Sequence, residues 1–335
     1  MKTPPIPTQP ISLNRRNFLY RSAGLMAAGW LAGNRLLAQT PATPAPTETP
    51  KTDPRPPAPP VTPEFHPLRR NVGYFTARGG TIGWLASPEA LAVVDTQFAD
   101  TAALCLAGLP GRADRTIDVV INTHHHGDHT SGNGVFKPVA KTIVAQANVP
   151  GLQRAAAERA KPPTTDKQVY ADTTFAEAWR KELGDEVVSA RYFGPAHTNG
   201  DTVILFEKAN VVHMGDLMFN RIYPVIDRVS GASIRNWIVI LEKVAKEYPA
   251  DAIYIFGHAG GKFGVSGQRP ELLVLRDYFT ALLEHVQTQI SAGKTKAEVS
   301  TLENFPGFPD FHQKLPNRLG GNLGVAYDEL TQAKT

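Results

Sequence analysis

The densest cluster of residues able to do chemistry is the stretch NTHHHGDH, residues 122–129, which holds four histidines and one aspartate. Neutral imidazole is a good zinc ligand, and a carboxylate oxygen is a natural partner for a second metal ion. Because alternate residues of an extended backbone point to one side, His124 and His126 can face the same metal. Asp128 and His129, which follow a glycine, can face another. The alternative is a solvated loop that is rich in histidine by accident.

Three later segments each end an apolar strand pattern with one potential ligand close to a glycine. The stretch GPAHTNGD presents His197 in a turn-rich loop, VVHMGD ends in Asp216, and IYIFGHAG carries His258. Ligands in α/β folds gather at the carboxyl ends of strands. A lone histidine in such a position is usually structural. Together with the first cluster, however, these three residues favour a metal centre.

The scaffold that must position these residues is predicted from the hydrophobic pattern. An apolar strand is predicted directly before the first cluster, and an antiparallel meander is predicted to open the domain. The predicted strands are 72–76, 81–85, 90–95, 116–122, 141–145, 187–193, 202–207, 210–214 and 252–256, and the predicted helices are 99–109, 148–159, 233–247 and 270–291. Strands and helices mixed in this order predict a layered α/β domain and not an all-β barrel.

The N-terminal region predicts export. Arg15 and Arg16 precede a short apolar run, residues 22–33, and Ala38 is a small residue after which cleavage is plausible. This arrangement resembles a twin-arginine signal peptide over residues 1–38. A membrane anchor is the alternative, but the run is shorter than the ~20 residues that a span needs. We therefore expect a periplasmic or secreted protein with no stable membrane span, whose precursor uses the twin-arginine export machinery.

Composition bounds the rest of the chain. Residues 39–64 are rich in Pro, Thr and Ala and predict a disordered linker, so the folded domain is predicted over residues 65–335. The 335 residues are 42% hydrophobic and 20% charged, which is ordinary for a globular protein. Beyond the arginine pair the cationic residues are scattered, so no nucleic-acid partner is expected. Cys105 is the single cysteine, which excludes an internal disulfide and a cysteine-based zinc site.

The ordered set of potential ligands resembles that of the metallo-β-lactamase superfamily, over residues from about 72 to 258. The resemblance implies a four-layer αββα sandwich with a dinuclear site at one edge. It also implies that Asp95 is a buried supporting acid. By position, the first metal would be held by His124, His126 and His197, the second by Asp128, His129 and His258, and both would be bridged by Asp216.

Such a site predicts hydrolysis. Two divalent metal ions, with Zn²⁺ favoured and Fe or Mn as alternatives, would lower the pKa of a bound water from 15.7 toward roughly 7. The resulting hydroxide would attack a carbonyl of a small-molecule substrate, and Asp128 would act catalytically by orienting the water and moving its proton. The predicted activity is therefore that of a zinc-dependent, β-lactamase-like metallo-hydrolase that cleaves an amide, ester or lactone.

Other activities stay open because the substrate is not specified by the ligands. Some β-lactamases of the family carry a cysteine where this chain has Asp216, and an aspartate there resembles the glyoxalase II and lactonase branches. The alternatives are a glyoxalase II-like thioester hydrolase, a mononuclear-iron sulfur dioxygenase and a catalytically silent metal-binding protein. The complete set of ligands favours a working hydrolase over the last two.

The segment after Asp216 is the candidate substrate-reading region. Asn220 and Tyr223 could donate to a developing oxyanion, and Arg221 could pair with a substrate carboxylate. Equally, Arg221 could form a surface salt bridge and Tyr223 could simply pack. The remaining candidates are expected to be structural or superficial, namely His125, His213, His66, His285, His312 and Cys105.

Overall fold

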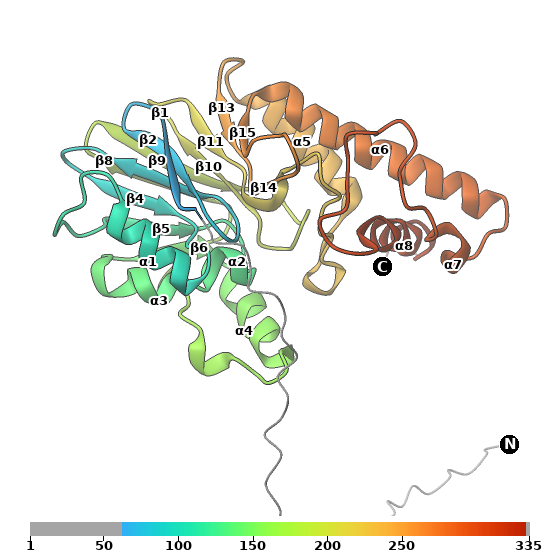
Figure 1. The fold of residues 1–335 in the computed structure, drawn as a ribbon, viewed down its shortest axis with the longest axis horizontal. Helices are drawn as coiled ribbons and strands as arrows, with labels where there is room; N and C mark the ends of the chain where they lie inside the picture. The colour runs from blue at the N-terminus through green and yellow to red at the C-terminus, as the bar shows by residue number, and fades with distance from the viewer. Residues whose placement is uncertain (1–61, 333–335) are drawn as a thin grey trace, which may run out of the picture. The chain divides into compact units, whose positions relative to one another are not determined.

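The computed structural model describes residues 62–332. The predicted signal peptide and nearly all of the predicted linker lie outside the described residues. Within them, two large mixed sheets pack face to face, and helices cover the outer face of each sheet (Figure 1). The predicted four-layer αββα sandwich is thereby confirmed.

The first sheet has seven strands in the order of the chain. The first four pair antiparallel, as the predicted meander requires, and the last four pair parallel. The strands are β1 (Glu64–Arg69), β2 (Val72–Thr76), β3 (Ile82–Ala86), β4 (Leu91–Val94), β5 (Val119–Asn122), β6 (Ile143–Gln146) and β7 (Thr173–Phe175). Every residue of β4 and β5 is buried, because these strands are covered on both faces.

The second sheet has six strands in the order β15-β13-β11-β10-β9-β8. Its one parallel pair joins β11 to β13, so the carboxyl ends of these two strands lie side by side. The strands are β8 (Ala178–Leu183), β9 (Glu186–Tyr192), β10 (Thr202–Phe206), β11 (Val211–His213), β13 (Ile253–Ile255) and β15 (Ser266–Gly267). A separate short ladder pairs β12 (Phe219–Asn220) with β14 (His258–Ala259).

Helices form the two outer layers. On the side of the first sheet lie α1 (Ala99–Gly108), α2 (Gly127–Thr130), α3 (Asn133–Phe136) and α4 (Val149–Arg159) (Figure 1). On the other side lie α5 (Ile234–Glu247), α6 (Arg269–Ser291), α7 (Lys296–Val299) and α8 (Arg318–Thr331). Four short 3₁₀ turns are η1 (Lys137–Val139), η2 (Thr165–Lys167), η3 (Gly215–Leu217) and η4 (Arg228–Ser230). Within residues 62–332, no helix combines the length and apolar character needed to cross a membrane.

Helix α5 illustrates how the sequence sets these elements. Ser233 caps it by accepting a hydrogen bond from the backbone N–H of Asn236. Its buried residues follow the helical spacing i, i+3, i+4, i+7, and they include Trp237, Ile240, Leu241 and Val244. This apolar stripe therefore docks the helix on the second sheet.

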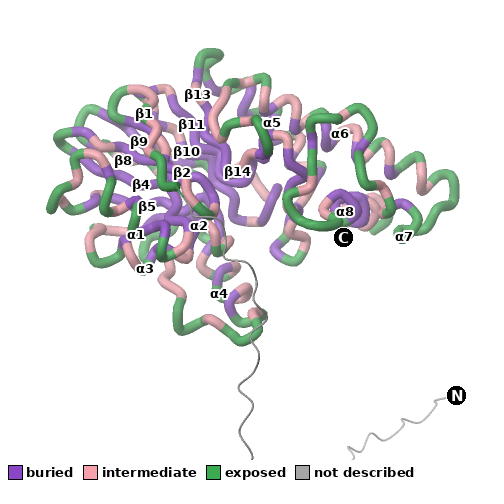
Figure 2. The backbone as a smooth tube through the Cα atoms, viewed as in Figure 1, coloured by how far each residue is buried: buried purple, intermediate pink, exposed green. Residues whose placement is uncertain are grey.

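Three apolar clusters correspond to the three junctions between the four layers. The middle cluster joins the inner faces of the two sheets, with Val94 and Ile121 from one and Ile204 and Ile255 from the other. The other two clusters join α1 and α3 to the first sheet, and α5, α6 and α8 to the second. Figure 2 shows the buried backbone running through the central strands of both sheets. The molecule is therefore a rigid sandwich on which edge loops can be held precisely in place.

All strands and helices predicted from the sequence are present, with ends that differ by a few residues. The prediction did not include β1, β7, β8, the short strands β12, β14 and β15, or helices α2, α3, α7 and α8. Pro67 weakens the strand signal of β1 in the sequence. The proline is tolerated there because β1 lies at the edge of the sheet. Gly320 and Gly321 in its first turn weaken the helical signal of α8.

Candidate metal centre

The potential ligands all lie at one end of the sandwich, because they follow the carboxyl ends of strands from both sheets. The structure brings all seven of them together. They are His124, His126, Asp128 and His129 after β5, His197 after β9, Asp216 after β11 and His258 after β13.

The first group of ligand atoms comes from three histidines and one aspartate. One donor atom from each of His124, His126, His197 and Asp216 lies within 4.8 Å of the others. The Nε2 atom of His197 is 2.9 Å from Nδ1 of His126 and 3.5 Å from Oδ2 of Asp216. Oδ2 of Asp216 is also 3.8 Å from Nε2 of His124. These atoms surround one point and do not spread over a surface.

The second group consists of Asp128, His129 and His258, again within 4.8 Å of one another. Oδ2 of Asp128 is 3.1 Å from Nε2 of His258 and 3.8 Å from Nε2 of His129. The side chain of Asp128 is 29% exposed, whereas those of His129 and His258 are 0% and 11% exposed. The second group therefore opens to solvent through Asp128.

Asp216 connects the two groups, because each of its carboxylate oxygens faces a different one. Oδ2 faces the first group, and Oδ1 lies 3.0 Å from Nε2 of His129 and 3.4 Å from Nε2 of His258. The side chain is only 3% exposed. This is the arrangement that a carboxylate bridging two cations requires.

Several of these atoms have no hydrogen-bond partner although they are buried. They are Nε2 of His124, Nε2 of His129 and Oδ1 of Asp216. Buried polar atoms are normally satisfied, so such a concentration of unsatisfied atoms needs an explanation. Ligands of a tetrahedral zinc ion at 2.0–2.1 Å would be about 3.3 Å apart, close to the separations found here. The nitrogen and oxygen donors therefore fit divalent metal ions.

Asp95 orients two of the imidazoles. Its Oδ2 accepts a hydrogen bond from Nδ1 of His129 at 2.7 Å and another from the hydroxyl of Thr123 at 2.8 Å. The Thr123 oxygen lies 3.0 Å from Nδ1 of His124, and accepts its proton because its own hydrogen points to Asp95. With Nδ1 engaged in this way, both histidines direct Nε2 at the site. The acid is fully buried, and its supporting role matches the one that the resemblance implied.

The other two imidazoles of the first group are oriented by different partners. Nδ1 of His197 donates to the backbone oxygen of Val225 at 2.8 Å, which leaves Nε2 for the site. Nε2 of His126 lies 3.0 Å from Oδ2 of Asp227, which leaves Nδ1 for the site. Asp227 also lies 3.7 Å from His125, so these two residues and His126 form a third close group. We interpret this third group as support for the ligands and not as another metal site. His126, the residue that it shares with the first group, already directs its Nδ1 toward His197.

The electrostatic environment keeps the ligand set suited to cations. Burial lowers the pKa of His124 well below its ordinary value and that of His197 to about 3, so both imidazoles are neutral. Burial alone would raise the pKa of Asp216, but the imidazoles of His258 and His129 hold it well below the usual range. Burial opposes the charged form of His129 too, yet Asp216 and Asp95 raise its pKa well above normal. A metal ion entering the site therefore displaces protons.

Two glycines make room for the ligands. A Cβ atom on Gly80 would overlap the imidazole ring of His129, and one on Gly257 would overlap Oδ1 of Asp216. The backbone N–H of Gly257 donates to the backbone oxygen of Gly215 at 2.8 Å, which holds the two strand ends together. Close approach of the backbone to the carboxylate thus needs glycine at position 257.

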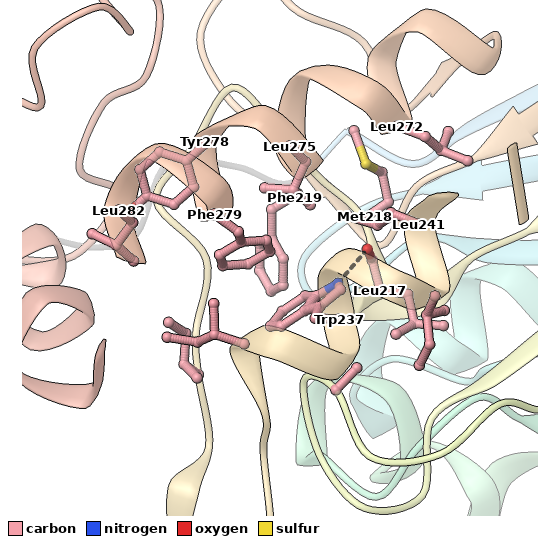
Figure 3. Close-up of a cluster of buried hydrophobic side chains, with 14 of the residues drawn as sticks. Leu217, Met218, Phe219, Trp237, Leu241, Leu272, Leu275, Tyr278, Phe279 and Leu282 are labelled. Atoms are coloured by element: carbon pink, nitrogen blue, oxygen red, sulfur yellow. Dashed lines mark hydrogen bonds between the residues drawn. The ribbon is translucent and has the colours of Figure 1, made fainter. Parts of the chain in front are cut away.

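An aromatic wall packs behind the ligands, and its members Phe219 and Trp237 belong to the apolar cluster that Figure 3 shows. The ring of Phe219 stacks on His258 with centroids 5.4 Å apart, and both Phe219 and Trp237 lie 5.6 Å from the ring of His197. Trp237 is fully buried, and its Nε1 donates to the backbone oxygen of Leu217 at 2.9 Å. The apolar core under the second sheet therefore fixes ligands of both groups.

A cavity of ≈ 170 Å³ opens beside the second group. Its polar lining includes the ligands Asp128 and His258 and two cations, Lys314 and Arg318. The remaining lining residues are apolar or aromatic, namely Phe219, Ile222, Tyr223, Val225 and Leu315. A substrate in this cavity would lie against the exposed edge of the site.

The three candidate substrate-reading residues are placed differently from one another. Tyr223 lines the cavity, but its hydroxyl accepts a hydrogen bond from the backbone N–H of Phe305 at 2.9 Å. Asn220 is buried and donates to the backbone oxygen of Gly264. Arg221 lies over the ring of Phe263, 5.2 Å from its centroid. Neither Asn220 nor Arg221 belongs to the lining of the cavity.

The histidines expected to be structural make internal contacts. His125 lies 3.2 Å from the hydroxyl of Ser230, and Nε2 of His213 lies 3.1 Å from the backbone oxygen of Thr81. Cys105 lies on the buried face of α1, and burial raises the pKa of its thiol. Outside the site, His66 and His285 are half-buried and His312 is exposed.

Sequence reasoning missed Asp227, Lys314 and Arg318. Asp227 precedes the turn η4 without a strand pattern before it, and it is 101 residues from its partner His126. Lys314 and Arg318 lie near the C-terminus, far from every ligand in the sequence. No local signal distinguishes these residues from ordinary surface charges.

Comparisons with known proteins agree with this geometry. The sequence model of the metallo-beta-lactamase superfamily matches residues 75–258. A probable metallo-hydrolase from Methanocaldococcus jannaschii is 26% identical over 174 residues, which cover 48% of this chain and 80% of that protein.

Solved structures with a similar fold include a metallo-beta-lactamase from Pontibacter korlensis, with a TM-score of 0.55 and 16% identity, where the match covers 65% of this chain and 99% of that one. The sec-alkylsulfatase Pisa1 from Pseudomonas sp. has a TM-score of 0.58 and 16% identity, with 80% of this chain and 50% of that one covered. At this level of identity the two likenesses concern the fold alone. Because the family match spans more than half of the 335 residues, the chain belongs to the metallo-beta-lactamase superfamily.

Proposed function

We propose that this protein is a dinuclear metal-dependent hydrolase that cleaves an amide, ester or lactone bond in a small molecule. The observation that carries the proposal is the position of Asp216, whose two oxygens face two separate groups of ligand atoms. A site for a single ion would not need a buried carboxylate between two such groups. The kinship with a probable metallo-hydrolase supports the same class of reaction.

The residues that would hold the ions are the two groups described above, with Asp216 shared between them. Zinc is the ion that we favour because it binds histidine nitrogen and carboxylate oxygen, which are the donors of both groups. When bound, the ions would supply a nucleophile at neutral pH by lowering the pKa of a coordinated water, and would polarise the carbonyl.

Asp128 is the residue of this chain best placed to handle a proton. Its carboxylate is partly exposed, lines the cavity, and lies 3.1 Å from Nε2 of His258. Although burial raises the pKa of Asp128, the imidazoles of His129 and His258 hold it below the usual range, so the group is ionised and able to accept a hydrogen bond from water. In that position it would orient the attacking water and receive its proton.

The cavity favours a small substrate. Its volume of ≈ 170 Å³ is below the roughly 300–1,000 Å³ of pockets for drug-sized ligands. Phe219, Ile222 and Val225 give it an apolar wall that would exclude water around the reacting carbonyl.

The test is a substrate screen with purified protein loaded with zinc. Lactam, lactone, ester, thioester and phosphodiester substrates are compared, each with chelator-treated protein and with the variant Asp216→Asn. We expect turnover of a lactam, lactone or ester that the chelator abolishes and two equivalents of zinc restore. Turnover of thioesters alone, or oxygen consumption supported by iron alone, would replace the proposal with one of the alternatives.

A further inference from the structure

The cavity beside the ligands is completed by the C-terminal segment, which follows the family match that ends at residue 258. This segment is held against the loop that leaves Asp216. The backbone N–H of His312 donates to the oxygen of Arg221 at 3.3 Å, and the N–H of Tyr223 donates to the oxygen of His312 at 3.2 Å. The segment therefore reaches the site as a fixed part of the fold.

Side-chain packing anchors both ends of the segment. Phe311 is buried, with its ring 5.9 Å from Tyr223 and stacked on Tyr278 at 4.9 Å. At the other end Leu319, in the first turn of α8, is fully buried. Lys314 and Arg318 lie between these anchors, so their position beside the cavity is built into the structure.

The charges of these two residues are not neutralised by direct ion pairs. Among residues 62–332, neither Lys314 nor Arg318 forms an ion pair with an aspartate or glutamate. Arg318 is half-buried, and burial lowers the pKa of its guanidinium. A partly desolvated cation without a partner is costly, and an anion that binds beside it offsets that cost. The acid in the cavity lining is Asp128, which belongs to the metal ligands.

We propose that Lys314 and Arg318 form a subsite for a carboxylate of the substrate, and that the apolar lining of the cavity receives the body that joins this carboxylate to the bond being cleaved. The carboxylate end would lie at the two cations, and the reacting carbonyl would lie at Asp128 and His258. This inference rests on the proposed function because it concerns the same cavity. It replaces Arg221, which lies outside the cavity lining, as the residue that reads the carboxylate.

Binding provides a test that does not need turnover. The zinc-loaded protein is titrated by calorimetry with phenylacetate and with phenylacetamide, which has the same shape but no charge. We expect Lys314→Gln and Arg318→Gln each to weaken phenylacetate binding about tenfold or more, and to leave phenylacetamide binding unchanged. The control is Lys262→Gln, an exposed lysine 3.6 Å from Asp310 that does not line the cavity. Unchanged phenylacetate binding in both variants would mean that the metal ions hold the carboxylate, and would overturn the proposal.

Kinetics provide the second test. The p-nitrophenyl monoester of glutaric acid carries a free carboxylate, and its methyl ester is neutral. We expect both variants to raise KM for the anionic ester about tenfold while kcat/KM for the neutral ester stays within about twofold. Equal loss on both esters would overturn the subsite. If wild-type protein cleaves neither ester but its phenylacetate binding depends on the two cations, the subsite stands and only the proposed reaction fails.

The salt dependence of binding to the wild-type protein tests the subsite even if the variants fold poorly. In the wild-type protein, phenylacetate binding is expected to weaken as sodium chloride rises, whereas phenylacetamide binding is not. Circular dichroism of each variant checks the fold. Identical salt dependence for the two probes would contradict an anion subsite without the use of any variant.

Discussion

The carboxylate of Asp227 lies 3.0 Å from Nε2 of His126, and this contact decides which nitrogen of the imidazole faces the ligand cluster. Because Asp227 accepts the proton on Nε2, Nδ1 is left unprotonated and points toward His197. Burial raises the pKa of Asp227, but its hydrogen bonds with His126 and Ser230 lower it below the usual range, so the acceptor is charged. An acid that none of the strand patterns indicated thus controls a ligand of the first group.

Replacing Asp227 by asparagine keeps the size of the side chain and removes its charge. We expect Asp227→Asn to weaken metal binding by about 10- to 100-fold, as for other partners of metal-bound histidines. Competition with a chelator of known affinity measures the effect. Asp114→Asn, which changes an exposed aspartate outside the site, is the control. Equal affinities for the two variants would show that Asp227 does not orient His126.

The glycine beside the bridging carboxylate gives a second prediction. In Gly257→Ala the new methyl group would collide with Oδ1 of Asp216, so we expect the metal content of the purified protein to fall. Gly151→Ala is the matched control, because Gly151 lies in helix α4 with open space around it. That change should raise the free energy of unfolding by about 0.5–1 kcal/mol and leave metal content unaltered. Full metal content in Gly257→Ala would contradict the crowding that we infer.

The ligands could be predicted from the sequence because each one follows a strong local pattern. His124 comes directly after the apolar strand β5, and Asp216 and His258 come shortly after β11 and β13. The parallel pairing of β11 with β13 then places the last two together. A strand, its end and the ligand that follows it can all be recognised from neighbouring residues in the sequence.

The residues that orient the ligands and those that line the cavity could not be predicted, because their positions depend on contacts between distant segments. Asp227 meets His126 only after the two sheets have packed. Lys314 reaches the cavity through a segment whose neighbouring helix α8 is weakly signalled by its sequence. Arg221 shows the converse, because it follows Asp216 closely in the sequence but turns toward Phe263 through a left-handed backbone with a φ of 60°. Sequence proximity to a ligand is therefore a poor guide to the lining of the site.

The number of ions is a third prediction. Protein stripped with a chelator and reloaded with zinc should bind two ions per chain, because Asp216 separates two sets of donors. Elemental analysis after gel filtration measures the stoichiometry. The thermal midpoint should also rise on loading, since ions that bind only the folded state stabilise it. A single tightly bound ion, even in excess zinc, would exclude a dinuclear centre.

Export is a fourth prediction, and it rests on the sequence alone because residues 15 and 16 lie outside the described residues. Changing Arg15 and Arg16 to lysine should retain the precursor in the cytoplasm of a bacterium that has the twin-arginine machinery. Fractionation followed by immunoblotting measures the distribution of the protein. Periplasmic delivery of the double variant at the wild-type level would rule out this signal.

The last prediction concerns the aromatic wall behind the ligands. Trp237→Phe removes the donor that binds the buried backbone oxygen of Leu217, and an unsatisfied buried acceptor costs about 1–3 kcal/mol. Trp84→Phe is an unusually close control, because Trp84 is also buried in a core but its Nε1 has no hydrogen-bond partner. Both variants lose a similar volume, so the difference between their free energies of unfolding reports the lost Trp237 hydrogen bond together with the relief of the unpaired Nε1 of Trp84.

Urea denaturation of the metal-free proteins measures that difference. We expect Trp237→Phe to be the less stable variant by about 1–3 kcal/mol. Trp237 also packs against the ring of His197, so Trp237→Phe should weaken metal binding. Trp84 lies in the cluster beneath α1 and makes no contact with a ligand ring, so Trp84→Phe should leave metal binding unchanged. Equal destabilisation and equal metal affinity in the two variants would mean that the core under the second sheet does not help to position the metal centre.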